Sequence, residues 1–120
     1  MITESINSIS FYKEVAETKN FWTVQRDGGV PTLQNNDGVN TFYVWSSRER
    51  VVKIIENEEP FQDCIPLEIP WANFAPKWLA ELASQGITFS LNWTGSNNMV
   101  WEESADEIRT NMEKYLSRIK

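Results

Sequence analysis

A tryptophan, two serines and two arginines stand where an aromatic segment of the chain gives way to a charged one: Trp45, Ser46, Ser47, Arg48 and Arg50. Residues 41–45 are aromatic or β-branched, as in a buried strand. Residues 47–57 place apolar side chains among charges, as on one face of a helix. The first turn of a helix offers unpaired N–H groups, and hydroxyls and guanidinium groups beside it suit an anion. These five residues are therefore a candidate site for an anion or small ligand.

The same corner has a simpler interpretation. Its charged side chains could be solvated, with Glu49 and Lys53 forming an ordinary surface pair four residues apart. Under either interpretation we expect Ser46 to cap the helix, with Glu49 reaching back to complete a capping box.

A second candidate is an acidic segment beside two tryptophans: Trp93, Trp101, Glu102, Glu103 and Asp106. Carboxylates next to exposed tryptophan suit a basic protein partner, because tryptophan is a frequent hot spot of protein interfaces. Alternatively, the carboxylates only favour the start of the last helix and the tryptophans cover the core. Ser104 and Glu107 predict a capping box at that helix start.

Composition excludes several kinds of chemistry. The 120 residues contain no histidine and one cysteine, Cys64, which we expect to be a small buried side chain. Catalysis by Ser/His/Asp or Cys/His sets and His- or Cys-rich metal sites are thus excluded. No acidic group has the spacing of a metal-binding loop, so we expect no catalytic residues, no metal and no cofactor. The net charge of -6 disfavours nucleic acid as a partner.

The length predicts a single domain over residues 1–120. The first residues lack a basic region followed by a long apolar run, so we expect no signal peptide and a cytoplasmic protein. No apolar stretch is long enough to span a bilayer, and we expect no membrane association. Nothing in the sequence indicates the oligomeric state.

Hydrophobic periodicity predicts an α+β fold. Helical spacing occurs in four segments: residues 5–19, 47–57, 73–85 and 104–119. Strand-like runs occupy residues 21–25, 30–34, 41–45, 64–69 and 87–91, with a short sixth strand at 99–101. Turn residues at 27–29 and 35–38 favour an antiparallel meander of the first three strands, the second starting late because of Pro31. We therefore expect a mostly antiparallel sheet of five or six strands with helices packed on it.

Pro76 determines where the third helix should begin. With Asn73 as the N-cap, Pro76 lies in the first turn, where its missing N–H costs nothing. A start at Trp71 would place Pro76 inside the helix and kink it. We therefore expect a start at Asn73 and an end at Gly86.

Several motifs occur in a recognisable order: Phe11-Tyr12, Phe21-Trp22-Thr23-Val24, Val44-Trp45-Ser46-Ser47-Arg48-Glu49, Ile65-Pro66-Leu67, and Trp78-Leu79-Ala80-Glu81-Leu82 before Gly86-Ile87. In this order the chain resembles a family of small bacterial proteins, the domain of unknown function 2750. The resemblance covers about residues 11–101 and leaves the last helix, residues 103–120, outside. It implies a common fold and brings no catalytic residues. Small bacterial domains of this build also look similar to immunity proteins that neutralise toxins, an analogy of architecture.

The acidic charge, the lack of nucleophile–base sets and the six tryptophans, a high number for this length, together favour a non-enzymatic cytoplasmic interaction protein, immunity-like, with a basic protein partner. The alternative is a small-ligand or anion-binding domain centred on the corner from Ser46 to Arg50.

Overall fold

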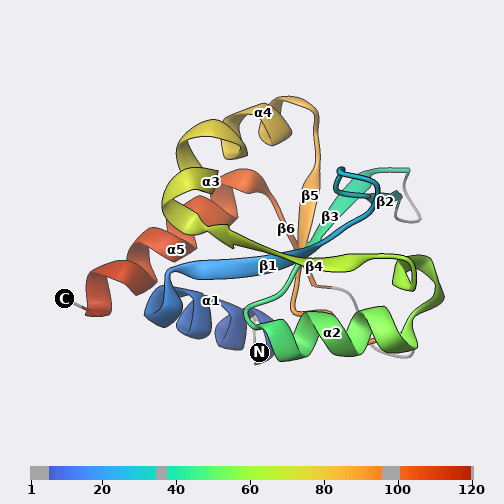
Figure 1. Ribbon diagram of the computed structural model, residues 1–120. Helices are drawn as coiled ribbons and strands as arrows, with labels where there is room; N and C mark the ends of the chain where they lie inside the picture. The colour runs from blue at the N-terminus through green and yellow to red at the C-terminus, as the bar shows by residue number, and fades with distance from the viewer. Residues whose placement is uncertain (1–5, 35–37, 96–100, 120) are drawn as a thin grey trace.

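The computed structural model describes residues 6–34, 38–95 and 101–119. The helices are α1 (Ile6–Thr18), α2 (Arg48–Asn57), α3 (Trp71–Lys77), α4 (Leu79–Ser84) and α5 (Ala105–Ile119), with a short 3-10 helix at Glu59–Phe61. The strands are β1 (Asn20–Gln25), β2 (Leu33–Gln34), β3 (Asn40–Val44), β4 (Ile65–Pro70), β5 (Thr88–Leu91) and β6 (Glu102–Glu103). Figure 1 shows α3, α4 and α5 on one side of β3, β5 and β6, with α1 and α2 below β1 and β4. The chain is thus a single compact α+β unit.

The described strands form two sheets, so the single sheet of five or six strands expected from the sequence is wrong. One sheet pairs β1 with β4, and the other has the order β2-β3-β5-β6. Three ladders are antiparallel, as predicted, but β3 and β5 run parallel. The two sheets meet at one bridge, where Trp22 and Trp45 exchange two backbone hydrogen bonds of 2.7 Å.

The predicted meander fails at its first step. Arg26 and Gly29 do close a tight turn, with φ of 52° at Asp27 and 81° at Gly28, as in a type I′ hairpin turn. The next strand, however, begins only at Leu33 and pairs with β3. Pro31 interrupts the segment between them, because proline cannot donate to a ladder. β1 is consequently free to pair with β4, which comes much later in the chain. The turn predicted at 35–38 lies largely outside the described residues.

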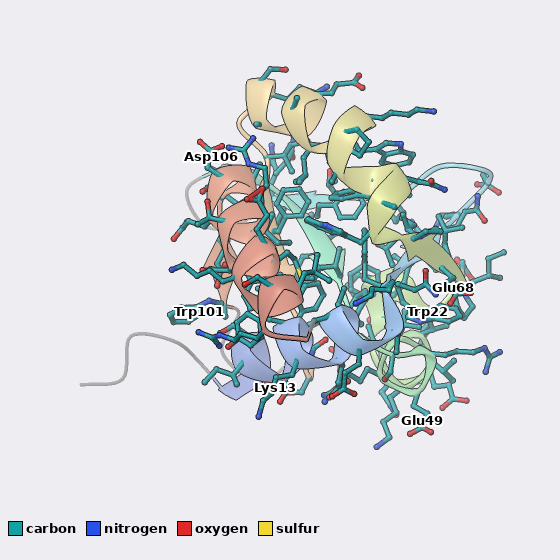
Figure 2. All side chains as sticks on the ribbon, turned by 90° about the vertical axis from the view of Figure 1, so that its left-hand side faces the viewer. Lys13, Trp22, Glu49, Glu68, Trp101 and Asp106 are labelled. Atoms are coloured by element: carbon teal, nitrogen blue, oxygen red, sulfur yellow. The ribbon has the colours of Figure 1, made fainter. Side chains whose placement is uncertain are left out.

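β4 is the outer strand of the smaller sheet, and its prolines suit that position. Trp22 lies opposite Glu68, and both are seen side by side in Figure 2. The backbone of Trp22 is bonded to Trp45 on the other side, so the pair Trp22–Glu68 is not hydrogen-bonded across the ladder. By the same alternation, Pro66 and Pro70 place their missing N–H groups on the outer edge. This edge therefore offers few donors to another strand.

Two hydrophobic clusters lie on either side of β1. The larger packs α1, α3, α4 and α5 against β3 and β5, and it includes Phe11, Phe21, Phe42, Phe74, Phe89 and Met112. The smaller lies under α2 and contains Val24, Trp45, Val51, Ile54, Phe61 and Cys64. Cys64 is 5% exposed, as expected for a small buried side chain.

The third helix begins at Trp71 and not at Asn73, so the prediction from Pro76 is wrong. Trp71 and Phe74 are both buried against Phe21, and this packing outweighs the cost of a proline inside the helix. The expected consequence of such a start is present, since α3 ends at Lys77 and α4 starts anew at Leu79. The predicted end is confirmed: Gly86 has φ of 71° after α4, a conformation that glycine adopts without strain.

Candidate functional site

The start of α2 is capped by Ser47. Its side-chain oxygen accepts a hydrogen bond of 3.3 Å from the N–H of Arg50. The prediction that Ser46 caps the helix with Glu49 in a capping box is therefore wrong. Ser46 is only 2% exposed and its hydroxyl has other partners, while Glu49 projects away from the molecule (Figure 2).

Ser46 is fixed by α1 and by the residue that follows β5. Its hydroxyl donates to Glu14 Oε1 at 2.6 Å and accepts from Asn92 Nδ2 at 2.9 Å. Its backbone N–H donates to Asn92 Oδ1 at 2.8 Å. Asn92 has φ of 53°, a left-handed conformation that asparagine tolerates better than most residues. Ser46 thus holds the strand-to-helix corner in place, and both its hydroxyl and its backbone N–H are used for that purpose.

Glu14 also binds Arg50, which ties α1 to α2. Arg50 donates from Nε to Glu14 Oε1 at 3.2 Å and from Nη2 to Oε2 at 2.8 Å. This two-point hydrogen bonding, with help from the Ser46 hydroxyl, lowers the pKa of Glu14 below its ordinary value of 4.5 despite partial burial. The side chains remain 33% exposed for Arg50 and 37% for Glu14, so water reaches the pair.

An open pocket of about 710 Å³, called the α2 pocket, lies beside Glu14 and Arg50. It is lined by Glu14 of α1, by the start of α2 and by residues after β5: Ser47, Arg48, Glu49, Arg50, Lys53, Ile54, Asn92, Trp93 and Thr94. Three lining side chains are cationic and two are carboxylates. Pockets of this volume accommodate small organic molecules. Of the five residues singled out at this corner, Ser47, Arg48 and Arg50 line the pocket, whereas Trp45 and Ser46 are buried behind it.

The cations of the pocket differ in whether they form an ion pair. Arg50 is paired with Glu14, as described above. Arg48 and Lys53 are exposed, and neither forms an ion pair within the described residues. The pocket can therefore offer two uncommitted cations to a negatively charged group, beside the partly exposed side chain of Trp93.

The acidic segment near the end of the chain is used differently. Glu103 in β6 is 5% exposed, and its carboxylate accepts hydrogen bonds from three side chains. The Tyr12 hydroxyl and Asn111 Nδ2 (3.2 Å) donate to Oε1, and Trp101 Nε1 donates to Oε2 at 2.7 Å. Burial, and secondarily the Glu103 carboxylate, raises the pKa of Tyr12 far above 10.0. Glu103 thus joins α1, β6 and α5 inside the protein, and the partly exposed Trp101 adds a bond to it from the same segment.

The remaining members of this candidate surface lie apart. Glu102 Oε1 accepts from the hydroxyls of Thr88 at 2.6 Å and Thr41 at 3.1 Å. Asp106 is exposed and pairs with Arg109 at 3.1 Å, and Trp93 lines the α2 pocket. Figure 2 shows Trp101 and Asp106 on the side of the molecule away from Glu49. The structure therefore does not bring the five residues into one acidic and aromatic surface.

The capping box predicted for the last helix is confirmed. The N–H of Ser104 donates to Glu107 Oε1 at 2.9 Å, and the N–H of Glu107 donates to Ser104 Oγ at 3.1 Å. These bonds link residues only three positions apart, which is why the sequence alone could predict them.

Sequence reasoning missed four residues that shape the two regions: Glu14, Asn92, Tyr12 and Asn111. Glu14 and Asn92 lie 32 and 46 positions from Ser46, and Tyr12 lies 91 positions from Glu103. No local pattern connects residues so far apart. The only signal was weak, namely that a glutamate on the first helix could face the arginines of the second.

Two further observations concern the described residues as a whole. None of their helices is long and apolar enough to cross a bilayer. Among them, no three acidic or cysteine side chains come together in a way that could hold a metal ion.

The chain belongs to a family of proteins of unknown function. Residues 9–112 match the model of the family described as "Protein of unknown function (DUF2750)", which confirms the resemblance seen in the sequence. The matched segment ends inside α5. A comparison with curated proteins found no match. The family description names no activity, so the site is what bears on the function.

Proposed function

We propose that this protein is a non-enzymatic binding domain that takes an anionic organic ligand in the pocket beside α2. One observation carries the proposal: Arg48 and Lys53 line a pocket of about 710 Å³ without an ion-pair partner among the described residues. Two cations that converge on a cavity attract a carboxylate or phosphate group. The volume is far larger than an inorganic anion needs, so the ligand has an organic part that rests on the partly exposed Trp93.

The residues of the chain support a role without catalysis. The chain contains no histidine, and Cys64 is buried in the smaller cluster. Ser46 donates to Glu14 as a nucleophile would to a base, but it is 2% exposed and lies behind the pocket. A substrate could not reach it without displacing the corner.

Phenyl phosphate is a suitable probe, because it joins an anionic group to a flat apolar one. We expect it to shift the amide signals of residues 47–53 and 92–94 in an NMR titration. The double variant Arg48→Ala/Lys53→Ala should weaken its affinity by about tenfold or more, the effect of losing one or two charge-assisted hydrogen bonds. The melting temperature should hardly change, because both side chains are exposed.

The matched control removes two exposed cations elsewhere, in Lys77→Ala/Lys114→Ala, and should bind like the wild type. Equal affinity of the two double variants would contradict the proposal, as would failure of phenyl phosphate to bind at millimolar concentration. Benzylamine, a cation of similar size, should not compete.

A second candidate is a protein-interaction domain with a basic partner, immunity-like in its role. The net charge of -6 supports it, as do two exposed apolar side chains, Ile65 at 59% and Trp78 at 40%. A pull-down from the native cell tests it. Recovery of a basic protein whose binding is lost in Trp78→Ala would favour this role over a small ligand, and an empty pull-down would count against it.

A further inference from the structure

The inner end of the α2 pocket already holds a carboxylate. Glu14 reaches across from α1 and accepts hydrogen bonds from the Ser46 hydroxyl at 2.6 Å and from two nitrogens of Arg50 at 3.2 and 2.8 Å. A hydroxyl and a forked guanidinium group are the donors that a carboxylate or phosphate of a ligand would use. Glu14 therefore occupies the place that such a ligand group would take.

The groups that bind Glu14 are themselves held in place by the fold. Ser46 is held by two hydrogen bonds to the side chain of Asn92, so the hydroxyl that binds Glu14 is fixed in direction. Arg50 lies in the first turn of α2, which is capped by Ser47. Glu14 itself is 37% exposed and lines the pocket, so an entering anion meets its charge directly.

Resting on the proposed function, we infer that Glu14 is an internal competitor for anions in this pocket and sets which ligands it accepts. A small anion meets the repulsion of Glu14, in addition to that of Glu49, and can use only Arg48 and Lys53. A larger organic anion also gains apolar contact with the partly exposed Trp93, which offsets that repulsion. The pocket thus selects against inorganic phosphate and in favour of anions with an organic body.

The test is a gain of function. In Glu14→Gln the carboxylate loses its charge but keeps its size and an oxygen that can accept from Ser46. We expect the affinity for inorganic phosphate to rise by about tenfold, since a neighbouring carboxylate disfavours an anion by an amount of this order. The affinity for phenyl phosphate should rise as well. The gain should disappear in Glu14→Gln/Arg50→Ala, because the released guanidinium group is then absent.

Glu17→Gln is the matched control, since it removes the same charge from an exposed position of α1 that does not line the α2 pocket. It should bind like the wild type. If Glu14→Gln does so too while Arg48→Ala/Lys53→Ala loses phenyl phosphate, this inference is overturned and the proposed function stands. If no protein binds either probe, both are overturned.

A measurement on the unchanged protein covers the event that Glu14→Gln does not fold. The Nε–H signal of Arg50 should move on addition of phenyl phosphate to the wild type, because Arg50 exchanges part of its bonding from Glu14 to the ligand. An Nε–H signal that stays in place at saturation would show that the ligand does not compete with Glu14 for Arg50, and would overturn the inference.

Discussion

Glu14 at the corner before α2 and Glu103 in β6 each gather several hydrogen-bond donors, but water reaches only Glu14. At the corner, Glu14 and Arg50 keep 37% and 33% of their side-chain surface exposed beside a pocket. Around β6, Glu103 is 5% exposed and Tyr12 is 1% exposed. The first arrangement can exchange a partner for a ligand, whereas the second cannot do so without opening the core.

This difference separates binding from stability. A buried carboxylate with three donors is costly to disturb, because each donor would be left without a partner in a region of low dielectric constant. An exposed ion pair contributes little to stability, because water and salt replace it readily. We therefore expect substitutions at β6 to change the stability of the protein and substitutions at the α2 pocket to change what it binds.

The largest expected effect is that of Glu103→Ala. It leaves the Tyr12 hydroxyl, the Trp101 N–H and the Asn111 amide without their acceptor, which should cost about 3 kcal/mol of unfolding free energy. Urea unfolding followed by circular dichroism measures this loss. Asp106→Ala, a change to an exposed carboxylate nearby, is the control and should cost about 0.5 kcal/mol or less. Similar losses in the two variants would remove the contrast between buried and exposed carboxylates.

A smaller effect should appear at alkaline pH. Folded Tyr12 keeps its proton above pH 10.0, because burial and Glu103 raise its pKa, whereas the unfolded chain releases that proton near 10.0. The contribution of Tyr12 is thus complete below pH 10.0 and declines above it. Tyr12→Phe should cost about 1–2 kcal/mol at pH 7 and show a shallower decline from pH 10 to about 11.

Tyr43→Phe provides the comparison, since burial and then Glu102 raise the pKa of Tyr43 as well. Its side chain is only partly buried, so its removal should cost less than that of the Tyr12 hydroxyl. An alkaline decline in Tyr12→Phe as steep as in the wild type would show that Tyr12 is not its cause.

The smallest effect is expected for the pair of Glu14 and Arg50. A double-mutant cycle with alanine should give a coupling of about 0.5–1 kcal/mol at pH 7, as for other partly exposed pairs. The pKa of Glu14 is lowered in the folded protein, below its ordinary value of 4.5. The contribution of the pair to stability is therefore present above pH 4.5 and is lost as the pH falls below that value. Repeating the cycle near pH 3 should therefore give a smaller coupling. A coupling that does not fall would mean that charge is not what joins the two residues.

The sequence predicted most helices and strands of the fold but fewer of the pairings and contacts between them. The helices at 6–18, 48–57 and 105–119 and the strands around Trp22, Phe42 and Phe89 follow the predicted segments closely. Their signals are local, since an apolar period or a cap involves residues within a few positions of each other. The start of α3 was mispredicted because the burial of Trp71 and Phe74 outweighs the local preference of Pro76.

The candidate site was predicted only in part, for the same reason. The sequence singled out Arg48 and Arg50, which line the α2 pocket, but it could not identify Glu14 or Asn92 as the partners of Ser46. It also marked Glu102 and Glu103 as a surface, although both bind side chains of distant elements.

The sequence by itself determined where most helices and strands form, where α5 is capped, and the family to which the chain belongs, because these depend on residue types and their spacing along the chain. The tertiary structure decided that β3 lies parallel to β5 and that β1 pairs with β4 instead of with the next strand in the chain. It also decided that Glu103 is enclosed while Glu14 faces a pocket. Such outcomes depend on packing between segments tens of residues apart. A carboxylate has the same chemistry in both places, and only its surroundings decide whether it is enclosed in the core or faces a pocket.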